Sequence, residues 1–161
     1  MNFILDGMLG KLARWLRMMG HNTKYSTTFD DEQLLCLAKQ ENRILLTRDL
    51  ALYQQTQARG IDGYYVEGNT EPERLAEITV RFGIPLEINL TQSRCPKCNN
   101  QLASISKEEI AGKLEKNTLL YYNHFWTCPK CGAVYWQGAH WTKIRATLEE
   151  AKQKLDEKNR V

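Results

Sequence analysis

Two stretches of sequence decide the fold, Phe3-Ile4-Leu5-Asp6 and Ile44-Leu45-Leu46-Thr47-Arg48-Asp49. Each contains a short apolar run, ends in an aspartate and is followed by a segment with helical character. In an open parallel sheet, strand ends that lead into helices converge on one edge, where ligand crevices form. Two or more carboxylates at that edge suit hard cations such as Mg²⁺ or Mn²⁺, the arrangement needed for metal-assisted phosphoryl chemistry.

The composition is typical of a globular protein. The chain has 161 residues, of which 42% are hydrophobic and 25% are charged. This length accommodates one domain, or one small domain with an appendage. No apolar run approaches the ~20 residues of a membrane span, so no membrane contact is expected. The first residues contain neither a basic region nor a long hydrophobic core, so we expect no signal peptide and a cytoplasmic protein.

Charge is distributed unevenly along the chain, whose net charge is +3. Residues 1–92 contain 10 Lys/Arg and 12 Asp/Glu, whereas residues 93–161 contain 12 Lys/Arg and 7 Asp/Glu. The basic C-terminal part favours a polyanionic partner, and a solvated charged surface is an equally common explanation.

Four of the five cysteines form two Cys-Pro-Lys-Cys pairs, Cys95 with Cys98 and Cys128 with Cys131. Two thiolates in one tight turn can share a metal, and four complete a closed tetrahedral Zn²⁺ site of structural type. Disulfides are the alternative, disfavoured in a protein expected in the cytosol. A redox role is less favoured still, because two matching pairs indicate one shared ion.

Residues 3–83 alternate between short apolar runs and amphipathic segments, a pattern typical of an α/β parallel sheet with right-handed crossovers. The expected strands are residues 3–6, 23–26, 43–47 and 63–66, and the expected helices are residues 8–19, 30–40, 50–59 and 71–83.

The pattern changes after residue 85. We expect an aromatic strand at residues 118–126 before the second cysteine pair and a second strand at 133–136 after it. This arrangement of strands and cysteines resembles a zinc ribbon. A charged helix follows, with Ile144, Leu148, Ala151 and Leu155 along one stripe. The predicted organisation is an α/β domain over residues 1–85, a zinc ribbon over 90–142 and a C-terminal helix over 143–161.

Acidic residues lie where the predicted sheet ends. Asp6 and Asp49 are the best candidates for direct metal ligands, and Asp31, with Asp30 beside it, could bring a third carboxylate to the same edge. Glu71 is a further candidate acid. Each of the aspartates could instead cap the helix that it begins. The combination favours a metal site, because carboxylates held together repel one another unless a cation neutralises them.

Basic and aromatic residues are candidates for binding nucleic acid. Lys11, Arg14 and Arg17 form the polar face of helix 8–19, and Lys11 and Arg14 could bind phosphate. A solvated basic face explains them equally well. Arg48 stands out because it lies between a strand and its terminal acid. Aromatic residues of the ribbon could stack on unpaired bases, or form a small core around zinc: Phe125, Trp126, Tyr135, Trp136 and Trp141.

Several of these strings together resemble the Mut-7 C-terminal ribonuclease domain family, a branch of the PIN-like fold. In the first half they are residues 5–17 (LDGMLGKLARWLR), 31–35 (DEQLL) and 44–49 (ILLTRD), and in the second half 94–99 (RCPKCN), 125–132 (FWTCPKCG) and 135–138 (YWQG). The resemblance implies a PIN-like parallel sheet sandwiched by helices, a fused zinc ribbon, a divalent-metal site and RNA as the substrate. Asp6, Asp31 and Asp49 take the family's acidic positions, and a fourth acid has only Glu67 or Glu71 as a counterpart.

The predicted function is hydrolysis of RNA phosphodiester bonds with Mg²⁺ or Mn²⁺. Asp6 and Asp49 are expected to bind the metal, with Asp31 as a ligand or water-orienting group. Arg48, with Lys11 or Arg14, is expected to hold the scissile phosphate. Two alternatives remain open, a non-catalytic RNA-binding module and a DNA-directed, flap-type nuclease. A receiver-like phosphoacceptor fits poorly, because no acidic pair follows the first strand.

Overall fold

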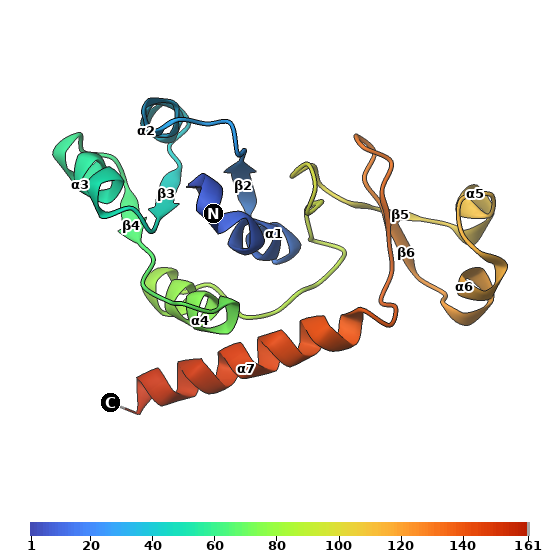
Figure 1. The fold of residues 1–161 in the computed structure, drawn as a ribbon. Coiled ribbons are helices and arrows are strands. Elements are labelled where there is room, and N and C mark those ends of the chain that lie inside the picture. Colours follow the sequence, from blue (N-terminus) through green and yellow to red (C-terminus); the bar gives the residue numbers. More distant parts are fainter. Residues whose placement is uncertain (161) are drawn as a thin grey trace.

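The computed structural model describes residues 1–160, within which four parallel strands form one sheet in the order β2-β1-β3-β4 and three antiparallel strands form another in the order β5-β6-β7 (Figure 1). The first sheet and its helices are β1 (Asn2–Leu5), the 3-10 turn η1 (Gly7–Leu9), α1 (Gly10–Met18), β2 (Asn22–Tyr25), α2 (Asp31–Gln40), β3 (Ile44–Thr47), α3 (Leu50–Ala58), β4 (Gly63–Tyr65) and α4 (Glu71–Phe82). The elements predicted for residues 3–83 are thus confirmed, with ends shifted by at most two residues.

The second sheet belongs to the part of the chain that holds the paired cysteines, which we call the cysteine module (residues 90–142). Its elements are β5 (Ala103–Ile105), α5 (Lys107–Ile110), α6 (Lys116–Tyr121), β6 (Phe125–Thr127) and β7 (Val134–Tyr135), and α7 (Trp141–Asn159) begins at its end. Among residues 1–160, no helix is long and apolar enough to cross a membrane.

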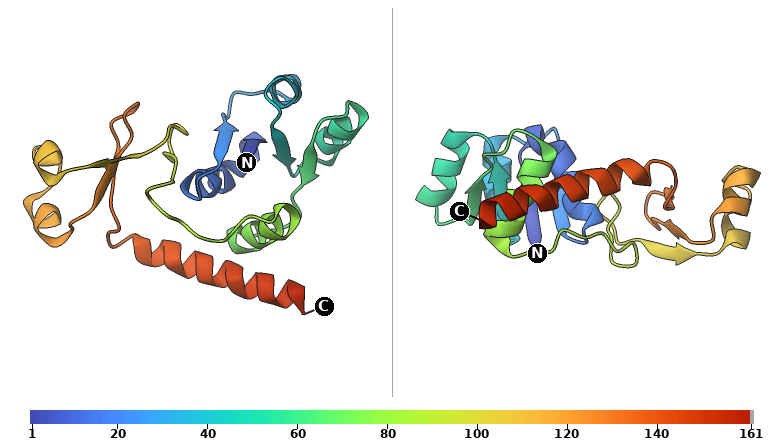
Figure 2. Two further views of the ribbon diagram at one scale, coloured as in Figure 1. Left: turned by 180° about the vertical axis from the view of Figure 1, so that it is seen from behind. Right: turned by 90° about the horizontal axis from the view of Figure 1, so that it is seen from below.

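Helices cover both faces of the parallel sheet, because its central strands are apolar on both faces. In β1, Phe3 and Leu5 belong to the core on one face and Ile4 to the core on the other. α1 and α4 pack on the first face, and α2 and α3 pack on the second (Figure 2). The predicted fold class, a parallel sheet between helices followed by a cysteine module and a C-terminal helix, is confirmed.

The C-terminal helix α7 runs from the cysteine module back along α4 (Figure 1). Ala151 is fully buried in the same core as α1 and α4, with Leu148 and Leu155 packed beside it. Ile144, at the other end of the predicted stripe, packs against the core of the cysteine module. α7 therefore bridges the two parts of the chain, and the division into three domains stays a prediction.

A buried arginine joins the cysteine module to the parallel sheet. Arg17 was expected on the polar face of its helix, but it is only 6% exposed, so that prediction is wrong. Its Nε donates to the carbonyl oxygen of Thr23 in β2 (2.9 Å), and its Nη1 donates to the carbonyl oxygen of Pro96 in the first cysteine pair (2.8 Å). Arg17 follows the buried Ala13 by four residues, and this spacing places both on one face of the helix.

The cysteine module also contacts the outer edge of β2, which is an edge strand of the parallel sheet. The Thr23 N–H donates to Asn99 Oδ1 (2.9 Å), and Asn99 Nδ2 donates to Asn22 Oδ1 (2.8 Å). Unpaired backbone groups on an edge strand can template wrong pairing, and Asn99 satisfies one of them here. Two more hydrogen bonds reach the last turn of α1, from the Arg94 N–H to Arg17 O and from Ser93 Oγ to Met18 O.

The strand expected at residues 118–126 is wrong over most of its length. Residues up to Tyr121 form α6, and only Phe125–Thr127 pairs as β6 between β5 and β7. Aromatic residues favour a strand only where a partner strand completes the pairing, and β5 reaches no further than the position opposite Phe125. The strand expected at 133–136 is confirmed as β7.

Replacing Arg17 with methionine is expected to lower the free energy of unfolding by about 2–4 kcal/mol, because two carbonyl oxygens lose their charged donor. Arg14→Met, on the exposed side of the same helix, is the matched control and is expected to change it by less than about 0.5 kcal/mol. Urea unfolding followed by circular dichroism measures both values. Equal stability of the two variants would contradict the joining role of Arg17.

Candidate active site and metal centre

Three aspartates share the carboxyl edge of the parallel sheet, and we call this set the acidic edge (Asp6, Asp31 and Asp49). Asp6 follows β1 directly and Asp49 follows β3 by two residues. The two strands pair in parallel, with Leu5 opposite Leu46, so both aspartates leave the sheet at the same edge. Asp31 is the first residue of α2.

The hydroxyl of Thr47 links the two strand-end aspartates. Thr47 Oγ1 donates to Asp6 Oδ2 (2.9 Å) and accepts from the Asp49 N–H (2.9 Å), and the residue is fully buried. One side chain therefore orients the Asp6 carboxylate and the backbone of Asp49 together. Sequence reasoning did not single out Thr47, although a hydroxyl at the end of an apolar strand, two residues before an acid, was the available signal.

Capping distinguishes the neighbouring acids of α2. Asp30 is the N-cap, since its Oδ1 accepts from the Gln33 N–H (2.8 Å) while Gln33 Oε1 accepts from the Asp30 N–H (2.9 Å). This capping box occupies Asp30 and leaves Asp31 available for other contacts. Asp49 also caps its helix, because its Oδ1 accepts from the Leu52 N–H (3.2 Å).

Electrostatics show that the acids interact. Burial raises the pKa of Asp31, and the negative charges of Asp49, Asp6 and Asp30 raise it further. Like charges have this effect when they share a site, and a bound cation would reverse it. Among residues 1–160, the four cysteines form the one group of three or more potential metal-ligand atoms that all lie within 4.8 Å of one another. The carboxylate oxygens of the acidic edge do not all lie this close together, so the acidic edge is more open than the cysteine group.

Arg48 anchors the loop after β4. Its Nη1 donates to the carbonyl oxygen of Gly68 (2.8 Å), and Nη2 donates to Asn69 Oδ1 (3.1 Å). The buried Glu77 carboxylate accepts from the Gly68 N–H (2.9 Å). A Cβ at Gly68 would lie only 2.9 Å from the backbone nitrogen of Arg74, so a larger residue does not fit there without a shift. These contacts hold the loop that follows β4 in place. The predicted contact of Arg48 with phosphate stays a prediction.

Glu71, the further candidate acid, lies beside Lys11. Its Oε1 pairs with Arg74 Nη1 (3.0 Å), while its Oε2 is buried without a hydrogen-bond partner among the described residues. Burial raises the pKa of Glu71, and the charges of Arg74 and Lys11 act in the opposite direction. Glu71 is not among the groups that raise the pKa of Asp31, so its membership of a metal site stays a prediction.

The residues predicted to bind RNA lie on α1 and at the start of α7. Lys11 and Arg14 are both exposed, one turn apart on α1. Trp141 is 8% exposed and belongs to the core of the cysteine module, with Leu90 and Leu102. Contact of Trp141 with RNA stays a prediction. In this conformation such a contact would have to be made through a cavity that Trp141 helps to line.

The cysteine pairs form two similar turns, which we call the first knuckle (Cys95–Cys98) and the second knuckle (Cys128–Cys131). The N–H after each knuckle donates to the carbonyl oxygen of its first cysteine at 2.8 Å, from Asn99 and from Gly132. Both of these residues have a left-handed backbone, with φ of 70° and 77°. Glycine adopts this conformation without strain, and asparagine tolerates it better than most residues.

The four sulfur atoms converge on one point. All lie within 4.8 Å of one another, with Cys98 3.2 Å from Cys128 and Cys95 3.7 Å from Cys131. A tetrahedral ion with metal–sulfur bonds of ~2.3 Å would separate its sulfurs by about 3.8 Å, so this group could hold a metal. Burial alone would raise the pKa of Cys95, but hydrogen bonds from Tyr135 and from backbone amides outweigh it and hold this pKa at about 7.

Arg17 also faces this group. Burial lowers the pKa of its guanidinium, and the charges of Cys95 and Cys98 act in the opposite direction. The side chain that joins the cysteine module to the sheet is therefore also a positive group near its sulfurs.

These features define an α/β protein with acids at the carboxyl edge of a parallel sheet and an attached four-cysteine module. Comparison with known families matches the chain to the Mut7-C RNAse domain over residues 1–148. The chain belongs to this family, which confirms the resemblance and points to a nuclease role. No curated protein and no solved structure matches the chain.

Without divalent metal, Asp31→Asn is expected to raise the melting temperature at neutral pH, because the pKa of Asp31 lies above its ordinary value of 3.8. A carboxyl whose pKa is raised by folding costs stability when the pH exceeds that pKa, and the cost disappears on protonation. The gain should therefore shrink as the pH is lowered through that pKa, as measured by scanning fluorimetry.

Mn²⁺ is expected to reverse this order, because an ion bound to the folded wild type raises its melting temperature. The matched control is Asp30→Asn, which keeps a competent N-cap and should retain the Mn²⁺ effect. An Asp31→Asn protein that melts below the wild type without metal would contradict the repulsion at the acidic edge.

Proposed function

We propose that this chain is a metal-dependent ribonuclease that hydrolyses RNA phosphodiester bonds at the acidic edge. One observation carries the proposal: the buried hydroxyl of Thr47 holds Asp6 and Asp49 in one hydrogen-bonded unit where the two central strands end. The family supplies the reaction class. The raised pKa of Asp31 supports a cation among these acids, since a cation would relieve their repulsion.

The acidic edge fits Mg²⁺ or Mn²⁺. Within residues 1–160, Asp6 and Asp49 each keep one carboxylate oxygen without a hydrogen-bond donor, and Asp31 keeps both. Mg²⁺ usually retains several waters and is held by one or two carboxylates together with substrate phosphate, so three open carboxylates suffice. When bound, the ion supplies Lewis acidity that activates water and offsets charge on the phosphate.

The other groups position the substrate. Asp6 and Asp49 hold the ion, and Asp31 serves as a third ligand or orients the attacking water. Lys11, in the first turn of α1, holds the scissile phosphate through its ammonium group, with Arg14 one turn further on. Arg48 is a positioning residue, because its guanidinium already holds the Gly68 loop.

We further propose that the cysteine group holds Zn²⁺ in a structural role. Four thiolates complete the tetrahedral shell and leave no position for a reacting water. The nearby Arg17 guanidinium offsets part of the negative charge of such a centre. Zinc binding thereby supports the attachment of the cysteine module to the sheet, because the first knuckle carries the Pro96 carbonyl that Arg17 holds.

Asp6→Asn and Asp49→Asn are each expected to lower the rate of RNA cleavage by a hundredfold or more, as removal of a metal ligand should. The assay follows single-stranded and structured RNA, and DNA of the same sequence, with Mg²⁺, with Mn²⁺ and with EDTA. The matched control is Asp62→Asn, an exposed aspartate that precedes β4 and so lies at the opposite edge of the sheet.

Metal-dependent cleavage of RNA by the wild type and Asp62→Asn, lost in the other two variants, is the expected result. Wild-type rates in both ligand variants would overturn the assignment of the acidic edge. Faster cleavage of DNA would replace the substrate by DNA, and RNA binding without cleavage would indicate a non-catalytic binding module.

The purified wild type is expected to contain one zinc ion per chain, and Cys128→Ser is expected to lose it. Mass spectrometry of the metal content measures this, with Asp6→Asn as the control that should keep its zinc. Zinc retained in Cys128→Ser but lost in Asp6→Asn would place the zinc at the acidic edge instead.

A further inference from the structure

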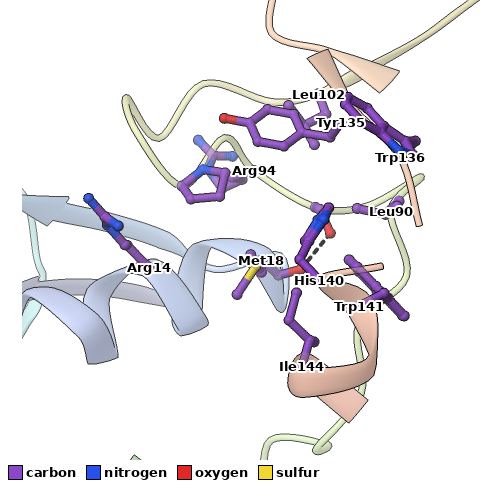
Figure 3. A pocket seen from close by; sticks show the side chains of 12 residues that line it. Arg14, Met18, Leu90, Arg94, Leu102, Tyr135, Trp136, His140, Trp141 and Ile144 are labelled. Carbon is purple, nitrogen blue, oxygen red and sulfur yellow. Dashed lines mark hydrogen bonds between the residues drawn. The ribbon is translucent and has the colours of Figure 1, made fainter. Parts of the chain in front are cut away.

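A cavity of about 260 Å³ lies where α1, the cysteine module and the start of α7 meet, and we call it the joint cavity. Figure 3 shows Tyr135 on one side of this space, Met18 and Ile144 on the other, and His140 between them. The walls come from all three elements. The cavity therefore depends on the contacts that hold the module against the sheet, among them those of Arg17 and Asn99.

The joint cavity is shaped for a small planar group. Its volume is just below the range of ~300–1,000 Å³ that is usual for small-molecule sites, so it can take one ring system and little more. Tyr135, Trp136 and Trp141 supply aromatic surface, and Met18 and Ile144 supply aliphatic surface. Bases of single-stranded nucleic acids stack on such aromatic side chains, because every base has a π-face.

Charge around the joint cavity favours a nucleic acid over an apolar peptide. Arg14 and Arg94 are among the residues that line it, and the described residues that line it include no acidic side chain. Arginine binds phosphate through paired donors. The surrounding half of the chain, residues 93–161, has 12 Lys/Arg against 7 Asp/Glu.

α1 connects the joint cavity to the acidic edge. The helix begins shortly after Asp6 and rises ~1.5 Å per residue, so Arg14 and Met18 lie about 6 and 12 Å along it from Gly10. A stacked strand advances ~3.4 Å per nucleotide, so this span corresponds to about two to four nucleotides. Lys11 and Arg14, exposed one turn apart, mark the path between the two sites.

We propose that the joint cavity binds one base of single-stranded RNA, a few nucleotides from the scissile phosphate, while Arg14 and Arg94 hold the phosphates on either side of it. RNA as the ligand rests on the proposed ribonuclease function. The cysteine module then has a direct part in binding the substrate, and the cleavage position is measured from an anchored base.

Abasic scanning tests this assignment. The probe is a fluorescein-labelled single-stranded RNA of mixed sequence, only about five nucleotides long so that it cannot slide to another register, with a single abasic ribose at each position in turn. It is bound to Asp6→Asn protein so that cleavage does not interfere. Removing the base that occupies the joint cavity should weaken binding between about fivefold and about 150-fold, the range for stacking of one base. Other positions should change binding much less, because the phosphates remain.

Filling the joint cavity provides the second arm. Ile144→Trp, combined with Asp6→Asn, places a ring in the space and should abolish the sensitivity of that one position. Thr142→Trp, an exposed position on the same helix, introduces the same side chain outside the cavity and should retain it. Arg14→Gln should weaken binding of intact and abasic probes equally, because it removes a phosphate contact.

Circular dichroism and zinc content establish that each variant is folded. A flat profile for the Asp6→Asn protein, or the same position-dependent profile in Ile144→Trp, overturns the base-binding role of the joint cavity. Cleavage by the wild type is measured separately. Binding that depends on no single base position, together with active cleavage, would contradict only this inference. Binding that depends on one base position, without cleavage, would contradict only the proposed function.

Discussion

The parallel pairing of β1 with β3 is the constraint on which the rest of the structure depends. It places Leu5 opposite Leu46, so that Asp6 and Thr47 follow at the same level and Asp49 leaves the sheet beside them. Because both strands are apolar on both faces, helices must cover each face, and every strand is followed by a helix that starts at this edge. The acids are therefore gathered by the same pairing that forms the core.

The second determining contact is the one between the cysteine module and the sheet. Arg17 reaches from α1 to both β2 and the first knuckle, and Asn99 satisfies the exposed edge of β2. The turn that holds the first cysteine pair thus lies against the edge of the parallel sheet. Since α7 returns from the module to pack on α4, the cysteine module is attached to the rest of the chain at both of its ends. The joint cavity lies between these two attachments.

Local signals were sufficient to predict much of the fold and the clustering of the four cysteines. The residues around Asp30 carry a capping box, and alternating apolar runs mark the central strands, so the elements of residues 3–83 were predictable. The Cys-Pro-Lys-Cys repeats were sufficient to predict one shared site. The aromatic residues at 118–126 led to a wrong strand prediction, because their preference for a strand depends on a partner strand to pair with. The chain folds Lys116–Tyr121 into α6 instead.

By itself the sequence determined the α/β order, the two strand-end aspartates and the four cysteines, because periodicity, capping and ligand spacing are local properties of the chain. Only the tertiary structure decided that Thr47 joins the two aspartates, that Arg17 is buried, and that Arg48 holds a loop. Each of these outcomes depends on hydrogen bonds between residues from 20 to 79 positions apart, or on burial by a distant segment, which no local pattern encodes.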